Sequence, residues 1–378
     1  MKVLTVVGAR PQFIKAAPVT RALREAGGIE EVLVHTGQHY DSNMSEVFFD
    51  ELEIPRPDHH LGVGSGGHGA QTGRMLERLE RVIIDEAPDV VLVYGDTNST
   101  LAGALAAAKL HVPVAHVEAG LRSFNRRMPE EINRVLTDHV ADILLTPTET
   151  AVENLRREGI PDERIHPVGD VMYDAALFFG EKAGRTSRIL GELDLEPRGY
   201  VLATVHRAEN TDDRARLVAI LEGLTSIATE LPVVLPLHPR TQAALAREGL
   251  LDRARRSLLV IEPVGYLDMI MLEKSARLVA TDSGGVQKEA FFHRVPCVTL
   301  RDETEWVELV RLGWNRLVPP TDGRAVSEGI RGSLRDSTPR EEPPADLYGG
   351  GRAAARIAEV LSENLASVRG QCAASPSS

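Results

Sequence analysis

The sequence predicts an α/β protein made of two doubly wound, Rossmann-like parallel sheets. Short apolar segments alternate with helix-forming segments along nearly the whole chain. Most apolar segments are continuous runs of Val, Leu and Ile, as parallel strands buried on both faces require. The chain also has 378 residues, which is too many for one ordinary hydrophobic core and suits two domains.

Each half of the chain contains five predicted strands. In the first half these are Val3–Val7, Glu31–Thr36, Val90–Tyr94, Val114–Val117 and Ile143–Thr146. In the second half they are Val201–Val205, Val233–Leu237, Leu258–Ile261, Arg277–Ala280 and Cys297–Leu300. Helix-forming segments such as Thr100–Leu110 and Glu131–Val140 lie between the strands, and this alternation builds parallel sheets.

The domain limits are expected near residues 175 and 351. The N-terminal domain would span residues 1–175 and the C-terminal domain residues 176–351, with the polar stretch Lys182–Arg198 at the break between the halves. A closing helix over 352–370 is expected to return to the first domain. Open α/β sheets bind ligands at the carboxyl ends of their strands, so two facing domains would share one cleft.

Composition favours a globular protein and disfavours nucleic-acid binding. Hydrophobic residues make up 43% of the chain, charged residues 26%, and the net charge is −12. Broad binding to nucleic acid needs an extended basic face. The two cysteines, Cys297 and Cys372, support neither a disulfide framework nor a zinc site. Without a signal-like start or an apolar run of about 18 residues, we expect a cytoplasmic protein with no membrane partner.

The segment Thr281-Asp282-Ser283-Gly284-Gly285-Val286-Gln287-Lys288-Glu289 is the strongest indication of a ligand. It joins the strand Arg277–Ala280 to a helix-forming run through a Ser-Gly-Gly turn. The backbone N–H groups and the positive helix end of such a turn suit a phosphate. Glu289 falls about one turn into the helix, within reach of a sugar hydroxyl beside that phosphate. The plainer interpretation is a Gly-rich turn without a ligand.

Other strand ends carry residues that suit the same ligand. Gly8 permits a tight turn after the first strand, and Arg10 and Lys15 can then face a phosphate or carboxylate. His206 ends a strand and can donate to an oxygen that leaves with a phosphate. The segment Pro263–Met269 resembles a loop whose backbone could edge a flat base. Each residue alone also fits an ordinary surface or core position.

Three carboxylates of the first half lie at strand ends or at a helix start. Asp96 follows the strand Val90–Tyr94, Glu118 follows the next strand, and Glu130 opens a helix-forming segment. Asp96 also suits a helix N-cap, and Glu130 with Glu131 also suits the positive end of a helix dipole. Together, carboxylates from three successive β–α units can perform acid–base chemistry on both faces of one carbon.

In this combination the motifs resemble the non-hydrolysing UDP-N-acetylglucosamine 2-epimerases over about residues 1–360. The segments that carry the resemblance, in chain order, are Gly8-Ala9-Arg10-Pro11, Gly95-Asp96-Thr97, His116-Val117-Glu118-Ala119-Gly120-Leu121-Arg122, Pro129-Glu130-Glu131-Ile132-Asn133-Arg134, His206-Arg207-x-Glu209 and Thr281-Asp282-Ser283-Gly284-Gly285-x-Gln287-x-Glu289. The resemblance implies the glycosyltransferase-B fold, usually as a homodimer, with a UDP-sugar as partner. It also implies no metal and no nicotinamide cofactor.

The resemblance also implies roles for these residues. The family inverts C2 of a UDP-sugar by eliminating UDP to a glycal and adding it back after a proton returns to the other face. By motif, Asp96, Glu118 and Glu130 transfer protons, and His206 assists the departing diphosphate together with Arg10. The implied substrate- and UDP-binding positions are Arg10, Lys15, Arg134, Met269, Ser283, Gly284, Gly285 and Glu289.

The sequence departs from the commonest family pattern at two places. Trp306-Val307 stands where many members have Arg-Pro, and Asp41 stands where members with an allosteric UDP-sugar site have a second Gln. Both departures, with the segment Val168–Asp174, resemble the subgroup acting on UDP-2,3-diacetamido-2,3-dideoxy-glucuronate. We therefore expect this uronate or UDP-N-acetylglucosamine as substrate, and the uronate is slightly favoured. The candidate cations for its carboxylate are Arg122, Arg126 and Arg127.

Three other functions fit parts of the pattern. A UDP-sugar glycosyltransferase of the same fold would share Glu289 and the phosphate turn, but would not need Asp96, Glu118 and Glu130 together. A hydrolysing epimerase would release UDP and free sugar. An inactive nucleotide-sugar-binding protein would keep the second-half site and could lose the three acids, all of which are present.

Overall fold

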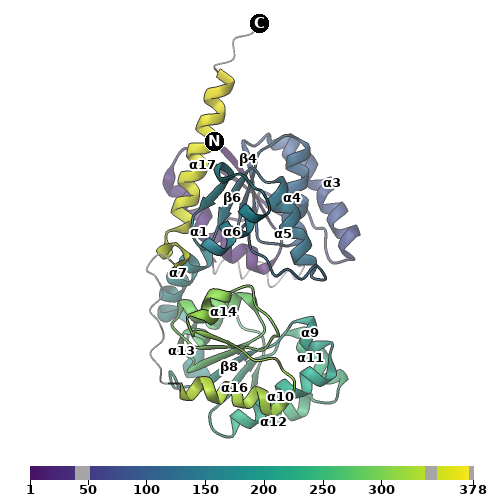
Figure 1. Cartoon of the computed structure of the whole chain (residues 1–378), viewed down its shortest axis with the longest axis vertical. Coiled ribbons are helices and arrows are strands. Elements are labelled where there is room, and N and C mark those ends of the chain that lie inside the picture. The colour runs from purple at the N-terminus through teal and green to yellow at the C-terminus, as the bar shows by residue number, and fades with distance from the viewer. Residues whose placement is uncertain (39–51, 337–346, 374–378) are drawn as a thin grey trace. The chain divides into compact units, whose positions relative to one another are not determined.

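A computed structural model describes residues 1–38, 52–336 and 347–373, without the side chains of Arg10 and residues 365–373. The chain divides into two compact units (Figure 1). One comprises Met1–Ala175 with Pro344–Ser378, and the other comprises Ala176–Pro343. The division falls inside a continuous helix, upstream of the polar stretch 182–198 where composition placed the break between the halves.

The first unit contains a seven-stranded parallel sheet in the order β3-β2-β1-β4-β5-β6-β7. Its strands are β1 Lys2–Val7, β2 Glu30–His35, β3 His59–His60, β4 Val90–Tyr94, β5 Val114–Val117, β6 Ile143–Thr146 and β7 Ile165–Pro167. The strand order reverses between β1 and β4, which pair in parallel from Val3 opposite Val90 to Val6 opposite Val93. Such a switch point is where open α/β sheets place ligands.

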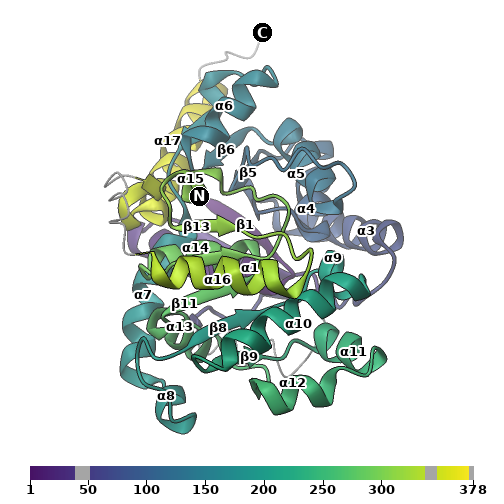
Figure 2. The same cartoon turned by 60° about the horizontal axis from the view of Figure 1, so that its bottom comes forward.

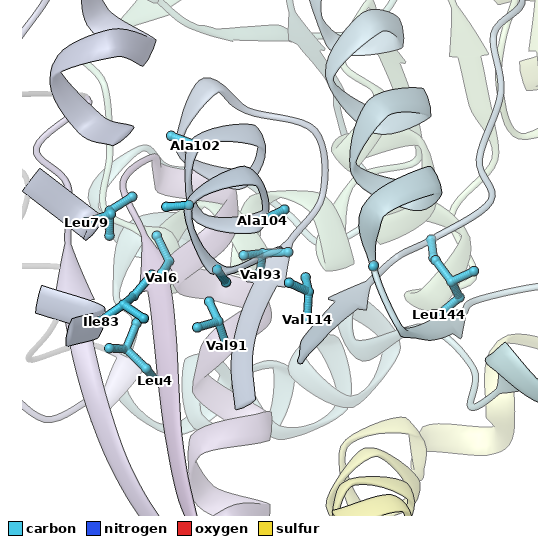
Figure 3. Close-up of a cluster of buried hydrophobic side chains, with 14 of the residues drawn as sticks. Leu4, Val6, Leu79, Ile83, Val91, Val93, Ala102, Ala104, Val114 and Leu144 are labelled. Atoms are coloured by element: carbon cyan, nitrogen blue, oxygen red, sulfur yellow. The ribbon is translucent and has the colours of Figure 1, made fainter. Parts of the chain in front are cut away.

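Helices cover the first sheet and bury its apolar strands. They are α1 Arg10–Ala26, α3 His68–Glu86, α4 Asn98–Lys109, α5 Pro129–Val140, α6 Glu149–Arg157 and α17 Ala353–Ala373, with 3-10 turns η1 Asp162–Arg164 and η2 Leu347–Gly351. Helix α7 Val171–Thr186 begins in this unit and continues into the second. Leu79 of α3 and Ala102 of α4 pack against Val6 and Val93 in the core (Figure 3). Because these strands are buried on both faces, they read as continuous apolar runs.

The C-terminal helix α17 packs against α1 within the first unit. The carboxylate of Asp174 accepts hydrogen bonds from the first backbone N–H groups of α17, Ala353 at 3.2 Å and Ala354 at 2.9 Å. Gly169 has φ 98° and lies so close to η2 that a Cβ would meet Gly349 Cα at 2.5 Å. The segment 168–174 therefore anchors the returning helix.

The second unit repeats the architecture with a six-stranded parallel sheet, ordered β10-β9-β8-β11-β12-β13. Its strands are β8 Val201–Thr204, β9 Val233–Pro236, β10 Leu259–Ile261, β11 Leu278–Thr281, β12 Cys297–Thr299 and β13 Asn315–Leu317. Its helices are α8 Ile189–Glu192, α9 Ala208–Thr211, α10 Arg214–Ala228, α11 Pro239–Arg247, α12 Leu251–Ser257, α13 Tyr266–Ser275, α14 Gly284–Phe292, α15 Val307–Arg311 and α16 Gly323–Arg335. Helices α10 and α16 lie side by side on this sheet (Figure 2).

The predicted fold class, two doubly wound parallel sheets, is confirmed. All ten predicted strands are present, with ends that differ by one residue or less. The pattern missed β3, β7 and β13, because two or three residues at a sheet edge are too few to show an apolar period. None of the described helices is long and apolar enough to cross a membrane.

Candidate functional site

The predicted residues of the first unit gather at the switch point of its sheet. Gly8 and Ala9 follow β1, Asp96 follows β4 and Glu118 follows β5, and these three strands are neighbours in the sheet. Since the strands are parallel, their carboxyl ends meet at one edge.

The buried side chain of Gln12, which sequence reasoning missed, ties the two central turns of this edge together. Its Oε1 accepts from the N–H groups of Gly8 at 2.8 Å and Ala9 at 3.0 Å. Its Nε2 donates to the carbonyl of Tyr94 and to Thr100 Oγ1, both at 3.0 Å. The β1–α1 turn is therefore held in register with the β4–α4 turn that carries Asp96.

Lys15 and Glu118 form an ion pair beside these turns. Their side chains are only 12% and 9% exposed. Glu118 has φ 71°, a left-handed backbone that is uncommon for residues other than glycine and is enriched at functional sites. Gly95 has φ 63°, and a Cβ there would lie 3.1 Å from Lys15 Nζ, so the turn approaches the pair closely. The predicted base and cation are thus brought together.

Arg134 joins Asp96 to Glu131. Its guanidinium forms ion pairs with the Asp96 carboxylate and, at 3.0 Å, with Glu131 Oε2. The carboxylate of Glu131 also accepts from Ser123 N, Ser123 Oγ and Phe124 N at 2.9–3.0 Å. Glu131 is therefore buried and occupied by the loop before α5, whereas Glu130 is exposed at the start of that helix.

In a second buried network, the guanidinium of Arg122 is bound by two carboxylates of the protein. Its Nε and Nη2 form a bidentate pair with Glu158, each bond 2.7 Å, and its Nη1 donates to Asp138 at 2.7 Å. Burial alone would raise the pKa of Asp138, but His116 and Arg122 hold it below its ordinary value. The expectation that Arg122 could serve a substrate carboxylate is wrong, because two protein carboxylates occupy its guanidinium. Arg126 and Arg127 of the same loop are exposed.

In the second unit, His206 and Asp282 flank the switch point between β8 and β11. The Asp282 carboxylate is fully buried and lies 3.4 Å from His206 Nδ1. It also accepts from the backbone N–H groups of His206 and Arg207, each at 3.1 Å. The imidazole of His206 is about two-fifths exposed, at 39%.

The start of α14 follows Asp282 directly and has the geometry of an anion site. Ser283 is the N-cap, and its hydroxyl accepts from Val286 N at 3.4 Å. A Cβ on Gly284 would meet Glu305 Oε1 at 2.5 Å, so a larger residue there would displace the Glu305 side chain. Arg301 pairs with Glu305 at 2.9 Å, and Arg207 lies 3.8 Å from it, so two arginines lie near the helix end. This arrangement favours phosphate.

The structure also places two further predicted ligand residues, Glu289 in α14 and Met269 in α13. Glu289 is buried and accepts from the Tyr266 hydroxyl at 3.3 Å, which orients the carboxylate proposed for ribose hydroxyls. The loop predicted over Pro263–Met269 ends at Gly265, because α13 begins at Tyr266. Met269 N therefore donates to Gly265 O within the helix, at 3.0 Å, and the prediction that it belongs to a loop is wrong.

Trp306 does not simply replace a cation by an aromatic surface. Lys288 Nζ lies 4.0 Å from the centre of the Trp306 ring, in cation–π geometry, and is almost fully buried. A cation from α14 therefore lies against the aromatic ring of Trp306.

Some predictions fall outside what the structure describes. These are the side chain of Arg10 and the residue Asp41. Among the described residues, no group of three or more His, Cys, Asp or Glu side chains could hold a metal ion.

Known proteins are similar to this chain in sequence and in fold over nearly its full length. The family described as UDP-N-acetylglucosamine 2-epimerase matches residues 21–362. A Pseudomonas aeruginosa protein named UDP-2,3-diacetamido-2,3-dideoxy-D-glucuronate 2-epimerase is 57% identical over 96% of this chain and 100% of that protein. The crystal structure of Methanocaldococcus jannaschii UDP-GlcNAc 2-epimerase with UDP-GlcNAc and UDP matches with a TM-score of 0.88 and 45% identity, covering 96% and 100% of the two chains. A Phytolacca americana glycosyltransferase, UGT2, matches at 12% identity and a TM-score of 0.57, covering 97% and 99%, which shows the fold alone.

Proposed function

The chain belongs to the UDP-N-acetylglucosamine 2-epimerase family, and we propose that it inverts C2 of UDP-2,3-diacetamido-2,3-dideoxy-glucuronate. It is a UDP-sugar 2-epimerase, an isomerase. The uronate is supported by the 57% identity to a protein named for that substrate. UDP-N-acetylglucosamine is the second candidate, because the 45% identical crystallised protein was solved with it.

The observation that carries the proposed chemistry is the pair of carboxylates at the carboxyl edge of the first sheet. Asp96 forms an ion pair with Arg134, and Glu118 forms one with Lys15. An ionised carboxylate is the form that can accept a proton from carbon.

We assign proton transfer at C2 to the first unit. One carboxylate among Asp96, Glu118 and Glu130 removes the C2 proton while the C1–O bond breaks and its electron pair leaves with UDP. The resulting glycal has a C1–C2 double bond. A proton then returns to the other face of C2, and UDP adds back to C1. The product is an isomer of the substrate, so the reaction needs no redox cofactor.

We assign nucleotide binding to the second unit. The start of α14, with Ser283, Gly284 and Gly285, would hold the diphosphate through backbone N–H groups. Glu289, oriented by Tyr266, would accept the ribose hydroxyls. His206 would donate to the diphosphate as it departs. The homodimer and the cytoplasmic location that the sequence predicts stay predictions.

The test is incubation with a panel of UDP-sugars in D2O, followed by NMR. We expect C2 epimerisation with deuterium entering C2, and a higher kcat/KM for the uronate than for UDP-N-acetylglucosamine. A product without deuterium would rule out elimination. Stoichiometric free UDP with free sugar would indicate a hydrolysing enzyme, and equal or higher efficiency on UDP-N-acetylglucosamine would reject the uronate.

A further inference from the structure

We propose that Asp282 is a positioning residue that orients His206 and stabilises its imidazolium form while UDP departs. The inference rests on the proposed function, in which His206 assists the diphosphate. It adds a residue whose carboxylate acts through the histidine, since Asp282 itself is fully buried.

The two residues are adjacent because the sheet order brings their strands together. β8 and β11 pair in parallel with Thr204 opposite Thr281, and Asp282 N donates to Thr204 O at 3.3 Å. His206 and Asp282 therefore leave neighbouring strands at the switch point, although 76 positions separate them in the chain. Nothing in the sequence spacing indicates this pairing.

The described groups around the Asp282 carboxylate are hydrogen-bond donors. Its oxygens accept from His206 N, Arg207 N and, at 3.0 Å, from Asn210 Nδ2. All of these groups are donors, and backbone N–H groups on a carboxylate stabilise its charged form. Of the described residues, His206 also approaches this carboxylate with its ring, and Nδ1 lies 3.4 Å from Asp282 Oδ1.

This geometry determines which proton the imidazole can give. In the proposed arrangement Nδ1 carries a hydrogen toward Asp282, and Nε2 is the nitrogen through which the ring acts on a diphosphate oxygen. Nε2 can donate only when the ring is doubly protonated. The negative charge of Asp282 favours that form, so the imidazolium persists to higher pH than it would beside a neutral side chain.

Other charged groups near His206 do not replace this effect. The His238 ring lies 5.4 Å away, centre to centre, and a second histidine would oppose the charge on the first. Arg207, the next residue, also opposes it and lies 3.8 Å from Glu305. Asp282 is the acid in contact with the ring within the described part of the second unit.

The alternative is that Asp282 only clamps the backbone after β8. Both roles lower stability when the carboxylate is lost, but only the proposed role moves the pH dependence of turnover. Asn210→Ala is the matched control, because it removes a donor from the same carboxylate while the charge beside His206 stays.

The experiment compares wild type, Asp282→Asn, His206→Asn, the double variant and Asn210→Ala on the substrate that shows C2 deuterium exchange. For Asp282→Asn we expect kcat to fall about 10-fold or more with little change in KM, and the alkaline limb of kcat to move down by roughly one pH unit. In the double variant the loss should match His206→Asn alone. Asn210→Ala should keep the wild-type limb.

An unmoved alkaline limb in Asp282→Asn, or losses that multiply in the double variant, would overturn the proposal. If Asp282→Asn does not fold, 15N NMR of the wild-type histidines with UDP decides the matter, since His206 must then carry hydrogen on both nitrogens. A neutral ring there would also overturn it. Absence of C2 exchange in the wild type would instead count against the proposed function, not against the Asp282–His206 contact.

Discussion

Lys15 and Glu118 form a nearly buried ion pair, although 103 positions separate them in the chain. Lys15 lies in the second turn of α1, and Glu118 directly follows β5. Taking one partner from a buried pair strands the other charge in a site that water reaches poorly. Loss of Lys15 is therefore expected to affect catalysis, whereas loss of a solvated surface lysine is not.

Lys15→Met should lower kcat by about 10-fold or more, because Glu118 loses the buried ion-pair partner that holds its carboxylate in position. Steady-state kinetics with UDP-sugar measures the effect, and thermal unfolding checks that the variant is folded. Lys109→Met, at an exposed position of α4, is the matched control and should behave as wild type. Wild-type turnover in Lys15→Met would show that the pair is structural.

Asp96→Asn, Glu118→Gln and Glu130→Gln should each lower kcat by about 100-fold or more, the scale of a lost general acid or base. UDP affinity, measured by calorimetry, should change little because the second unit is assigned to the nucleotide. A near-normal kcat in Glu130→Gln would show that Glu130 only interacts with the positive end of the helix dipole, which fits its exposed position.

Glu131→Gln provides the contrast. Its carboxylate accepts from Ser123 and Phe124 and pairs with Arg134, so its loss should loosen the loop before α5 and the support of Asp96. We expect a lower melting temperature together with lower kcat. A kcat loss at unchanged stability would instead indicate a direct role in proton transfer.

Substrate choice should depend on the exposed arginines of that loop. Arg126→Ala or Arg127→Ala should reduce the preference for the uronate over UDP-N-acetylglucosamine, because a desolvated Arg–carboxylate contact discriminates strongly. Competition kinetics with the two sugars measures the ratio. Arg122→Ala should destabilise the fold by about 3 kcal/mol through Asp138 and Glu158, with the preference of any folded enzyme unchanged. If both loop variants keep the wild-type preference for the uronate, neither Arg126 nor Arg127 binds its carboxylate.

Kinetics should be hyperbolic and unaffected by added UDP-N-acetylglucosamine. Asp41 stands where regulated members carry Gln, and a carboxylate would meet a diphosphate unfavourably. Asp41 lies outside the described residues, so this prediction rests on the sequence alone. Initial rates against uronate concentration, with and without the second sugar nucleotide, measure it. Sigmoidal curves that the second nucleotide straightens would contradict it.

Acid should destabilise the first unit through His35. Burial, and then the charge of His60, lower the pKa of His35 to about 4, and its Nδ1 accepts from Gly37 N at 2.8 Å, which requires an unprotonated nitrogen. Between about pH 6.5 and 4 the unfolded chain therefore binds one more proton here, and stability falls as pH falls, by about 1.4 kcal/mol per pH unit.

Urea unfolding followed by circular dichroism across that pH range measures the slope. His35→Asn should reduce the slope by about one proton. The control is His111→Asn, at an exposed position with φ 58° that asparagine tolerates, and its slope should match wild type. An unchanged slope in His35→Asn would mean that His35 is protonated as readily in the folded chain as in the unfolded one.

The repeated strand–helix architecture could be predicted from the amino-acid sequence, since central parallel strands are buried on both faces and must be continuously apolar. The sequence also indicated Asp96, Glu118, His206 and the α14 turn, because strand ends and helix starts have local signatures that a single segment displays. Motif resemblance over the full chain then led to the family. These are properties of short segments read in order.

Which of these side chains contact one another depends on the three-dimensional fold. Arg122 and Glu131 appear in the same motifs as Glu118 and Glu130, yet buried carboxylate and backbone partners occupy them. Gln12 ties two turns together through a contact with Tyr94, 82 positions away in the chain. Asp282 lies beside His206, 76 positions away. Such contacts depend on strand order and on burial, and a polar residue has no local pattern that tells whether its partner is solvent, substrate or another side chain.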